Sequence, residues 1–272
     1  MIGPSPSWRT DMERLYDVYF ASRDYEQRYP RPNAGTLDFL WRHGVALARH
    51  VVDVGCGNGR YAMPVLGRSR ARMVCCDISR GAINALELKL RGSTVRDRVT
   101  LVVGGAEDLA PEARFDRLLL LFGVLSHVGP RAARVDMLRQ LRQRCVPDAR
   151  LLLSVPSFWR RRPRELLGSL LALARGRGEG LGDVRFTRKV AGRPQTFYYH
   201  LYTVAGLREE LAQGGWQLHA PEAESLLPEW LVTQSRIAAR FDQMLQKMCP
   251  AALGYGIRAW ATPLDPRTDE AT

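Results

Sequence analysis

A short loop rich in glycine carries the clearest chemical pattern in the sequence. Residues 51–61 read VVDVGCGNGRY, an apolar run containing Asp53 and followed by glycines at every second position. Glycine lets the backbone turn sharply and brings its N–H groups against a ligand without an intervening side chain. A dinucleotide-binding loop needs G-x-G-x-x-G/A, but Arg60 stands at the last small position, and no G-K-[ST] follows as in a P-loop. Because an acid at the strand end would also repel a pyrophosphate, the pattern predicts a ligand without phosphate.

The elements around this loop are those of an α/β protein, since short apolar runs alternate with stretches of helical spacing. The expected strands are 50–54, 72–77, 99–103, 117–122, 150–155, 216–219 and 253–261. The expected helices include 61–66, 79–91, 131–145 and 203–213. This alternation predicts a Rossmann-like, doubly wound, mostly parallel seven-stranded sheet with helical cap insertions. Ligands of such sheets bind beyond the carboxyl ends of the strands, where the glycine loop lies.

A second acid closes the next expected strand. Asp77 ends RMVCCD, 22 residues after Gly55, and a carboxylate at this position can accept both hydroxyls of a ribose. Together, the acid, the glycine loop and Asp77 resemble the motifs of class I S-adenosylmethionine-dependent methyltransferases, and the resemblance extends more weakly over residues 45–220. The resemblance implies that S-adenosyl-L-methionine is the cofactor and that Asp53 acts on its ammonium group, directly or through water. The cofactor-binding residues that it implies are Asp53, Gly55, Cys56, Gly57, Asn58, Gly59, Asp77, Ile78, Ala106, Glu107 and Phe122.

Two later motifs match the family less closely. In VVGGAEDLA, Gly105 replaces an acid that the family often places near the adenine amine, so the Ala106 backbone and Glu107 are the candidate contacts. Glu107 is alternatively a solvated turn residue. The stretch FGVLSHVG, residues 122–129, resembles the motif that lines the methyl-donor pocket. It offers His127 as a general base for a hydroxyl or amine acceptor, or as a histidine that only fixes the loop geometry.

Three segments outside the shared core are expected to select the methyl acceptor. Residues 1–45 are predicted to form an N-terminal helical lid, and 46–272 the methyltransferase core with substrate-cap insertions at 156–197 and 221–250. The third segment includes an expected helix over 233–248. The candidate substrate-pocket residues are Tyr16, Tyr25, Tyr29, Trp159, Tyr199 and His200. For most of the tyrosines the alternative is packing of a helix onto the sheet.

The middle segment is rich in arginine. Its first part, FWRRRPRELLGSLLALARGRG (158–178), contains Arg160, Arg161, Arg162, Arg164, Arg175 and Arg177. With the leucines between them they predict an amphipathic helix, which could lie on an anionic membrane surface, bind phosphate in RNA, or cover the active site with its arginines in water.

Composition limits the remaining choices. The formal net charge is +12, and only three of the 40 basic residues are lysines. This charge leaves open a nucleic acid partner, an anionic membrane surface, and a plain solvated surface. No apolar run approaches the roughly 20 residues of a membrane-spanning helix and no signal peptide precedes the core, so a cytoplasmic protein is predicted. No cysteine or histidine spacing predicts a metal site.

Three functions follow from these observations. The favoured one is methyl transfer to an O or N atom of a small-molecule metabolite, in secondary metabolism. The second is a tRNA-modifying methyltransferase, since YYH at residues 198–200 faintly resembles wobble-uridine tRNA methyltransferases. The third is a catalytically silent partner protein that binds S-adenosylmethionine. The sequence fixes neither the acceptor, nor whether O, N or C is methylated, nor the oligomeric state.

Overall fold

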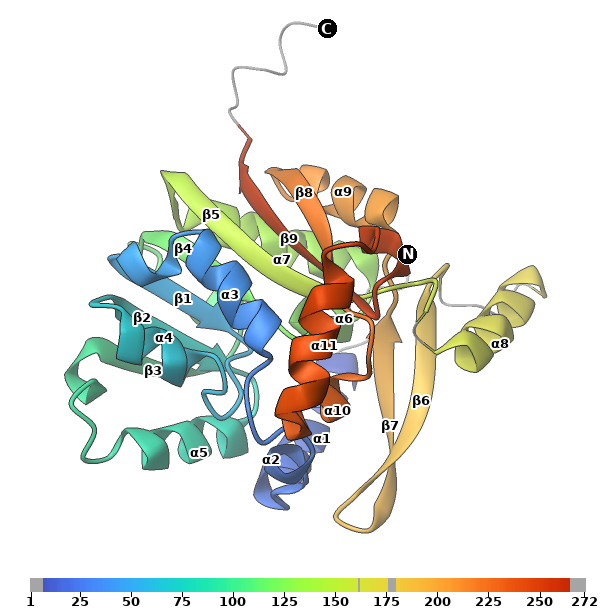
Figure 1. The fold of residues 1–272 in the computed structure, drawn as a ribbon, viewed down its shortest axis with the longest axis horizontal. Helices are drawn as coiled ribbons and strands as arrows, with labels where there is room; N and C mark the ends of the chain where they lie inside the picture. Colours follow the sequence, from blue (N-terminus) through green and yellow to red (C-terminus); the bar gives the residue numbers. More distant parts are fainter. Residues whose placement is uncertain (1–6, 161, 176–179, 265–272) are drawn as a thin grey trace, which may run out of the picture.

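The protein is built around one seven-stranded sheet, as Figure 1 shows for the computed structural model. The structure describes residues 7–160, 162–175 and 180–264. The strands are β1 (His50–Val54), β2 (Arg72–Asp77), β3 (Val99–Val103), β4 (Phe115–Leu120), β5 (Cys145–Pro156), β8 (Trp216–Ser225) and β9 (Gly256–Pro263). Their order is β3-β2-β1-β4-β5-β9-β8, and only β9 runs against its neighbours β5 and β8. The predicted Rossmann-like, mostly parallel seven-stranded sheet is confirmed.

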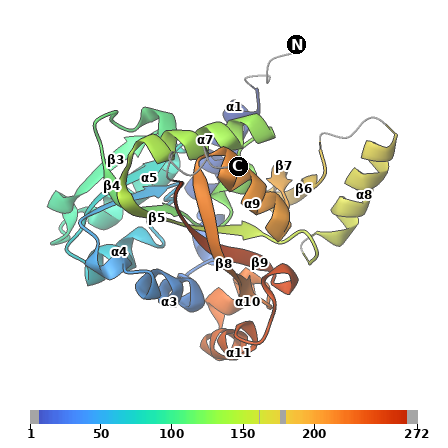
Figure 2. The same cartoon turned by 90° about the horizontal axis from the view of Figure 1, so that it is seen from above.

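Helices cover both faces of this sheet (Figure 2). One face carries α7 (Arg131–Gln143) and α9 (Val204–Gln213), and the other carries α3 (Ala34–Arg42), α4 (Ala62–Arg68) and α5 (Arg80–Leu90). Strand side chains point alternately into the two cores, with Leu118 facing α7 and α9 and Leu119 facing the other three helices. Such strands are buried on both faces, which is why they read as continuous apolar runs in the sequence.

A third apolar cluster lies beyond the carboxyl ends of the strands. It joins α1 (Ser7–Ala21) and α2 (Asp24–Arg28) to a separate hairpin of β6 (Asp183–Val190) and β7 (Arg193–His200). Helix α1 also packs on α5. Its Asp17 Oδ1 accepts hydrogen bonds from Ser79 Oγ at 2.7 Å and Gly81 N at 2.9 Å. The N-terminal helix is thereby tied to the turn that follows β2.

The middle insertion differs from the helical cap that the sequence predicts. It holds one helix, α8 (Pro163–Ala174), but continues into the β6–β7 hairpin. The hairpin turn contains Ala191 and Gly192, both with positive φ (50° and 75°), the geometry of a tight two-residue connection. Buried and exposed side chains alternate along β6, a period-two pattern that indicates a strand. Arg161 and Arg177 of the arginine-rich segment lie outside the described residues.

Other predicted elements change at their boundaries. The single helix expected over 233–248 is instead α10 (Glu229–Gln234) followed by α11 (Arg236–Gln246), because Ser235 takes an extended conformation and its side chain caps α11. Strand β8 continues past residue 219 to Ser225, and β9 begins at Gly256 because Ala251–Leu253 forms a 3-10 turn. Helix α7 ends at Gln143, two residues earlier than expected, because strand β5 already begins at Cys145.

In the described part of the chain, no helix combines the length and apolar character needed to cross a bilayer. The same residues contain no group of three or more His, Cys, Asp or Glu side chains placed to hold a metal ion.

Candidate active site

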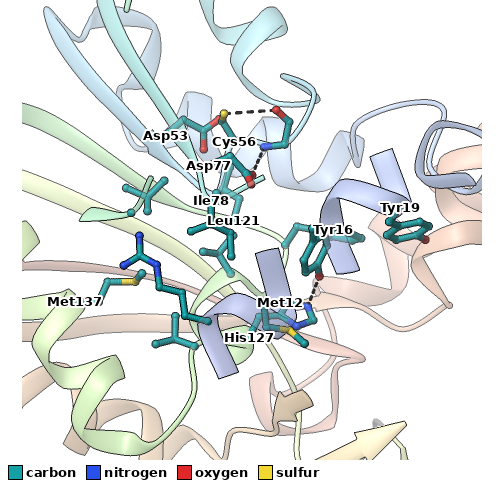
Figure 3. A pocket seen from close by; sticks show the side chains of 18 of the residues that line it. Met12, Tyr16, Tyr19, Asp53, Cys56, Asp77, Ile78, Leu121, His127 and Met137 are labelled. Carbon is teal, nitrogen blue, oxygen red and sulfur yellow. Dashed lines mark hydrogen bonds between the residues drawn. The ribbon is translucent and has the colours of Figure 1, made fainter. Parts of the chain in front are cut away.

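A cavity of about 420 Å³ lies where β1, β2 and β4 end (Figure 3). The loops after these strands form one side, α1 and α7 flank it, and the hairpin closes the far end. Among its lining residues are Met12, Tyr16, Tyr19, Tyr25, Tyr29, Asp53, Gly55, Cys56, Gly57, Arg60, Asp77, Ile78, Glu107, Leu121, Phe122, His127, Met137, Phe186, Arg188, Phe197 and Tyr199.

The glycine loop is folded against its own strand ends. Gly55 N and Cys56 N both donate to Cys76 O, at 2.8 and 3.1 Å, and Gly57 N donates to Asp77 Oδ2 at 2.8 Å. These N–H groups are therefore satisfied within the protein and do not form the N–H-rich surface that the sequence predicted for a ligand. Glycine is needed at Gly55 because φ is +70° and a Cβ would lie 2.4 Å from Val124 Cγ2.

Two buried carboxylates stand beside this loop. Asp53 lies on the central strand β1, and Asp77 ends β2 next to it. Burial, with the charge of Asp77 adding, raises the pKa of Asp53 to about 8. Burial also raises the pKa of Asp77, to about 6, although backbone N–H bonds from Ser79 and Gly57 oppose the rise. A ligand cation beside Asp53 would reverse its shift, because an opposite charge favours the ionised carboxylate.

His127 stands at the other end of the same cavity, at the C-terminus of the short helix α6 (Val124–His127). Its Nδ1 lies 3.0 Å from Tyr198 O and its Nε2 lies 2.8 Å from Tyr16 Oη. A carbonyl oxygen can only accept, so we assign the proton to Nδ1, which leaves Nε2 to accept from Tyr16. Burial raises the pKa of Tyr16 well above its ordinary value, which keeps this hydroxyl protonated.

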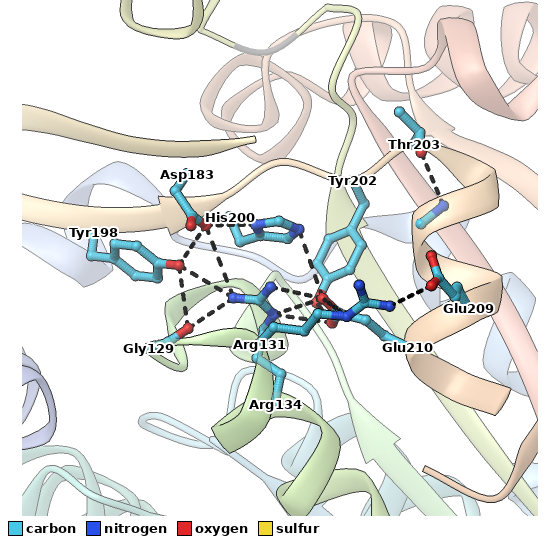
Figure 4. A network of polar contacts seen from close by, with 11 residues as sticks. Gly129, Arg131, Arg134, Asp183, Tyr198, His200, Tyr202, Thr203, Glu209 and Glu210 are labelled. Atoms are coloured by element: carbon cyan, nitrogen blue, oxygen red, sulfur yellow. Dashed lines mark hydrogen bonds and ion pairs between the residues drawn. The ribbon is translucent and has the colours of Figure 1, made fainter. Parts of the chain in front are cut away.

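A buried polar network fixes the hairpin strand that holds His127 (Figure 4). Arg134 of α7 forms a double hydrogen bond with Glu210 of α9 and donates to Gly129 O at 2.8 Å. The Tyr198 hydroxyl donates to Asp183 Oδ1 at 2.6 Å, and the same oxygen lies 2.6 Å from His200 Nδ1. The network ties α7, α9 and the hairpin together, so the Tyr198 carbonyl is held where it meets His127.

Most of the predicted site residues line this one cavity. Those that do are Tyr16, Tyr25, Tyr29, Asp53, Gly55, Cys56, Gly57, Asp77, Ile78, Glu107, Phe122, His127 and Tyr199. Glu107 is nevertheless paired with Arg9 of α1.

Five predicted residues are placed elsewhere. The Asn58 amide donates to Glu26 Oε1 at 2.8 Å, and Gly59 packs on Leu86 of α5. Ala106 is fully buried in a core. Trp159 is 63% exposed, and His200 belongs to the Asp183 network. Trp159 thus faces solvent, and the other four residues pack in the core or take part in hydrogen bonds that spacing along the sequence does not reveal.

The sequence prediction also missed several lining residues. Met12 and Tyr19 share the cavity face of α1 with Tyr16, a spacing of i, i+4 and i+7 that could have found them. Phe186 and Arg188 also line the cavity, two residues apart on one face of β6. This spacing identifies them only when 183–190 is known to be a strand. In the sequence, Arg60 indicates only that the glycine loop does not bind a dinucleotide. It is buried, stacks over Phe122 at 4.5 Å and pairs with Glu229.

Comparison with known proteins agrees with this geometry. Residues 51–148 match the model of a family described as a methyltransferase domain. No curated protein sequence matches the chain. Many solved structures share its fold, among them the following three. The Burkholderia thailandensis 1,6-didemethyltoxoflavin-N1-methyltransferase is 18% identical, with a TM-score of 0.61 over 97% of this chain and 94% of that one.

The other two are similarly distant in sequence. The CcbJ methyltransferase from Streptomyces caelestis is 16% identical, with a TM-score of 0.59 over 86% of this chain and 91% of that one. The glycopeptide N-methyltransferase MtfA is 18% identical, with a TM-score of 0.57 over 86% and 90% of the two chains. Residues 51–148 thus match a methyltransferase domain, and the chain has the fold of these methyltransferases.

Proposed function

We propose that the protein transfers a methyl group from S-adenosylmethionine to an O or N atom of a small-molecule metabolite. One observation carries the proposal: a single cavity joins Asp53 and Asp77 at one end to His127, Tyr16 and Tyr199 at the other. Its volume is in the range of small-molecule sites, and α1 and the hairpin bound it. We place this activity in secondary metabolism as part of the proposal, since solved structures with this fold include a didemethyltoxoflavin and a glycopeptide methyltransferase.

The residues at the carboxylate end fit the cofactor. It carries an ammonium and a sulfonium but no phosphate, and Asp53 is a buried carboxylate whose ionised form needs a nearby cation. Asp77 already accepts two backbone N–H bonds, yet two carboxylate oxygens offer about four acceptor sites, enough to receive ribose hydroxyls as well. When bound, the cofactor supplies an activated methyl group at its sulfonium.

The residues at the other end fit an acceptor that must lose a proton. His127 Nε2 is held as an acceptor by the Nδ1 bond to Tyr198 O. An acceptor O–H or N–H that replaces the Tyr16 hydroxyl at Nε2 would hand its proton to His127 as the new bond to carbon forms. The aromatic walls, including Tyr199 and Phe122, exclude water and orient the acceptor for in-line displacement.

The test is methyl transfer with two classes of acceptor. The protein is incubated with methyl-labelled S-adenosylmethionine and either the small-molecule extract or the bulk tRNA of a strain that lacks its gene. We expect label in the small-molecule fraction, in products one methylene heavier than their precursors, and none with the Asp77→Ala variant. Label in tRNA would replace the proposal with the tRNA-modifying function. Tight S-adenosylhomocysteine binding without transfer to either fraction would favour the silent partner.

A further inference from the structure

A second cavity of about 400 Å³ adjoins the first on the hairpin side. Tyr29 and Arg188 line both cavities. The ion pair between Arg60 of the first cavity and Glu229 of the second also spans the wall between them. The residues that line the second cavity are Arg28, Tyr29, Arg162, Pro163, Arg164, Glu165, Arg188, Pro228, Glu229, Trp230 and Tyr255.

The charges of this second cavity are unbalanced. Four of its lining residues are arginines and two are glutamates. Both glutamates are already used, Glu165 by Arg162 at 3.0 Å and Glu229 by Arg60. Among the described residues, no carboxylate is paired with the other three arginines, Arg28, Arg164 and Arg188. Like charges gathered beside a cavity repel one another, and a bound anion removes that cost.

Two arginines of the second cavity are held in fixed positions. Arg188 Nη1 donates to Tyr19 Oη at 3.0 Å, and its guanidinium lies over Phe197 at 5.5 Å. Arg28 Nε donates to Tyr29 Oη at 3.2 Å. A guanidinium fixed by stacking loses less side-chain entropy when it binds an oxyanion, so these contacts prepare the site.

The first cavity has the opposite charge at its far end. Asp53 and Asp77 lie beside the glycine loop, whereas Arg188 stands on the hairpin wall. The buried Arg60 Nη1 also has no hydrogen-bond partner among the described residues, although its side chain lines this cavity. A ligand that reaches both cavities thus meets acids where the cofactor fits and the guanidinium of Arg188 at the wall that the cavities share.

We propose that the methyl acceptor carries an anionic group, a phosphate ester or a carboxylate, which binds among Arg28, Arg164 and Arg188 in the second cavity. Its nucleophilic atom then lies in the first cavity near His127. The identity of this ligand as the acceptor rests on the proposed function, but the anion site itself does not. Arg188 is the specificity-determining residue, because it lines both cavities.

The test measures binding of simple probes without methyl transfer. Calorimetry with and without S-adenosylhomocysteine compares phenyl phosphate, benzoate and neutral benzyl alcohol. We expect the better anion to bind at least about tenfold more tightly than benzyl alcohol, since charge-assisted hydrogen bonds to arginine are the strong ones. Phenyl phosphate and benzoate distinguish a phosphate-bearing from a carboxylate-bearing acceptor.

Arginine variants locate the binding. Arg188→Met should weaken binding of the preferred anion about tenfold, and the exposed Arg164→Met, which lines only the second cavity, about threefold. The matched control is Arg193→Met, the same charge loss at an exposed position on the same hairpin. Equal affinity for benzyl alcohol, or equal weakening by Arg193→Met, would overturn the proposal. Because cofactor binding is measured separately in each variant, this failure is distinct from failure of the methyltransferase function.

Discussion

The two ends of the main cavity are held in place by different means. At the cofactor end, the loops that follow adjacent parallel strands bring Asp53, Gly55 and Asp77 together through backbone hydrogen bonds. At the acceptor end, side chains from α1, α6 and the hairpin meet, and Arg134 and its partners secure them from behind. The first arrangement depends on strand register, whereas the second depends on packing between segments far apart in the chain. We expect substitutions at the cofactor end to change the affinity for the cofactor, and substitutions at the acceptor end to change the rate of methyl transfer.

The largest effect is expected at the acceptor end, from His127→Ala. Removing the proton acceptor should lower kcat about 10²- to 10⁴-fold for an acceptor that must lose a proton. The S-adenosylhomocysteine affinity should stay unchanged, as measured by calorimetry. The matched control is His219→Ala, a histidine on β8 that stacks on Trp260 away from the cavity. An unchanged kcat would show that His127 only fixes the loop.

At the cofactor end, Asp77→Ala should weaken S-adenosylhomocysteine binding about 100-fold, because it removes a charged acceptor and releases Gly57 N and Ser79 N. Asp136→Ala removes an exposed carboxylate from the rim of the same cavity and serves as its control in calorimetry. Equal affinities in the two variants would contradict the cofactor assignment.

Gly55→Ala tests how strictly the loop backbone is fixed. A non-glycine residue at φ +70° costs about 1–3 kcal/mol of strain, and the new Cβ would also meet Val124. Thermal unfolding should therefore show a lower Tm, with weakened cofactor binding. In contrast, Gly67→Ala in helix α4, where a Cβ meets nothing within 4 Å, should gain about 0.5–1 kcal/mol. A tolerated Gly55→Ala would mean that the loop rearranges freely.

The last expected effect is a pH dependence of cofactor binding. Burial raises the pKa of Asp53 to about 8, so below that pH the empty site holds a protonated carboxyl. A bound ammonium favours the ionised form, and binding then releases a proton. S-adenosylhomocysteine affinity should rise by up to about tenfold per pH unit between pH 6.5 and 8 and then level off. Calorimetry in buffers of different ionisation enthalpy checks the proton release, which Asp53→Asn should abolish.

The same contrast explains what could be predicted from the sequence. The strands and the glycine loop follow from apolar runs and glycine spacing, and the acids at the strand ends then share an edge because the strands are parallel. The strands expected from the sequence leave out residues 183–200, where Ala191 and Gly192 form a turn that pairs the YYH stretch with β6. His200 has the residue type of a site residue, but Asp183 engages it. No local pattern reveals a partner 17 residues away.

Helix α1 lies along the cavity and is held in place by the carboxylate of Asp17. Asp17 holds the helix to the turn after β2, while Met12, Tyr16 and Tyr19 lie along the cavity. A movement of this helix away from the cavity would break both hydrogen bonds. We expect these two hydrogen bonds to slow any opening of the cavity along α1, so that Asp17 would influence the rate of ligand exchange although it does not line the cavity.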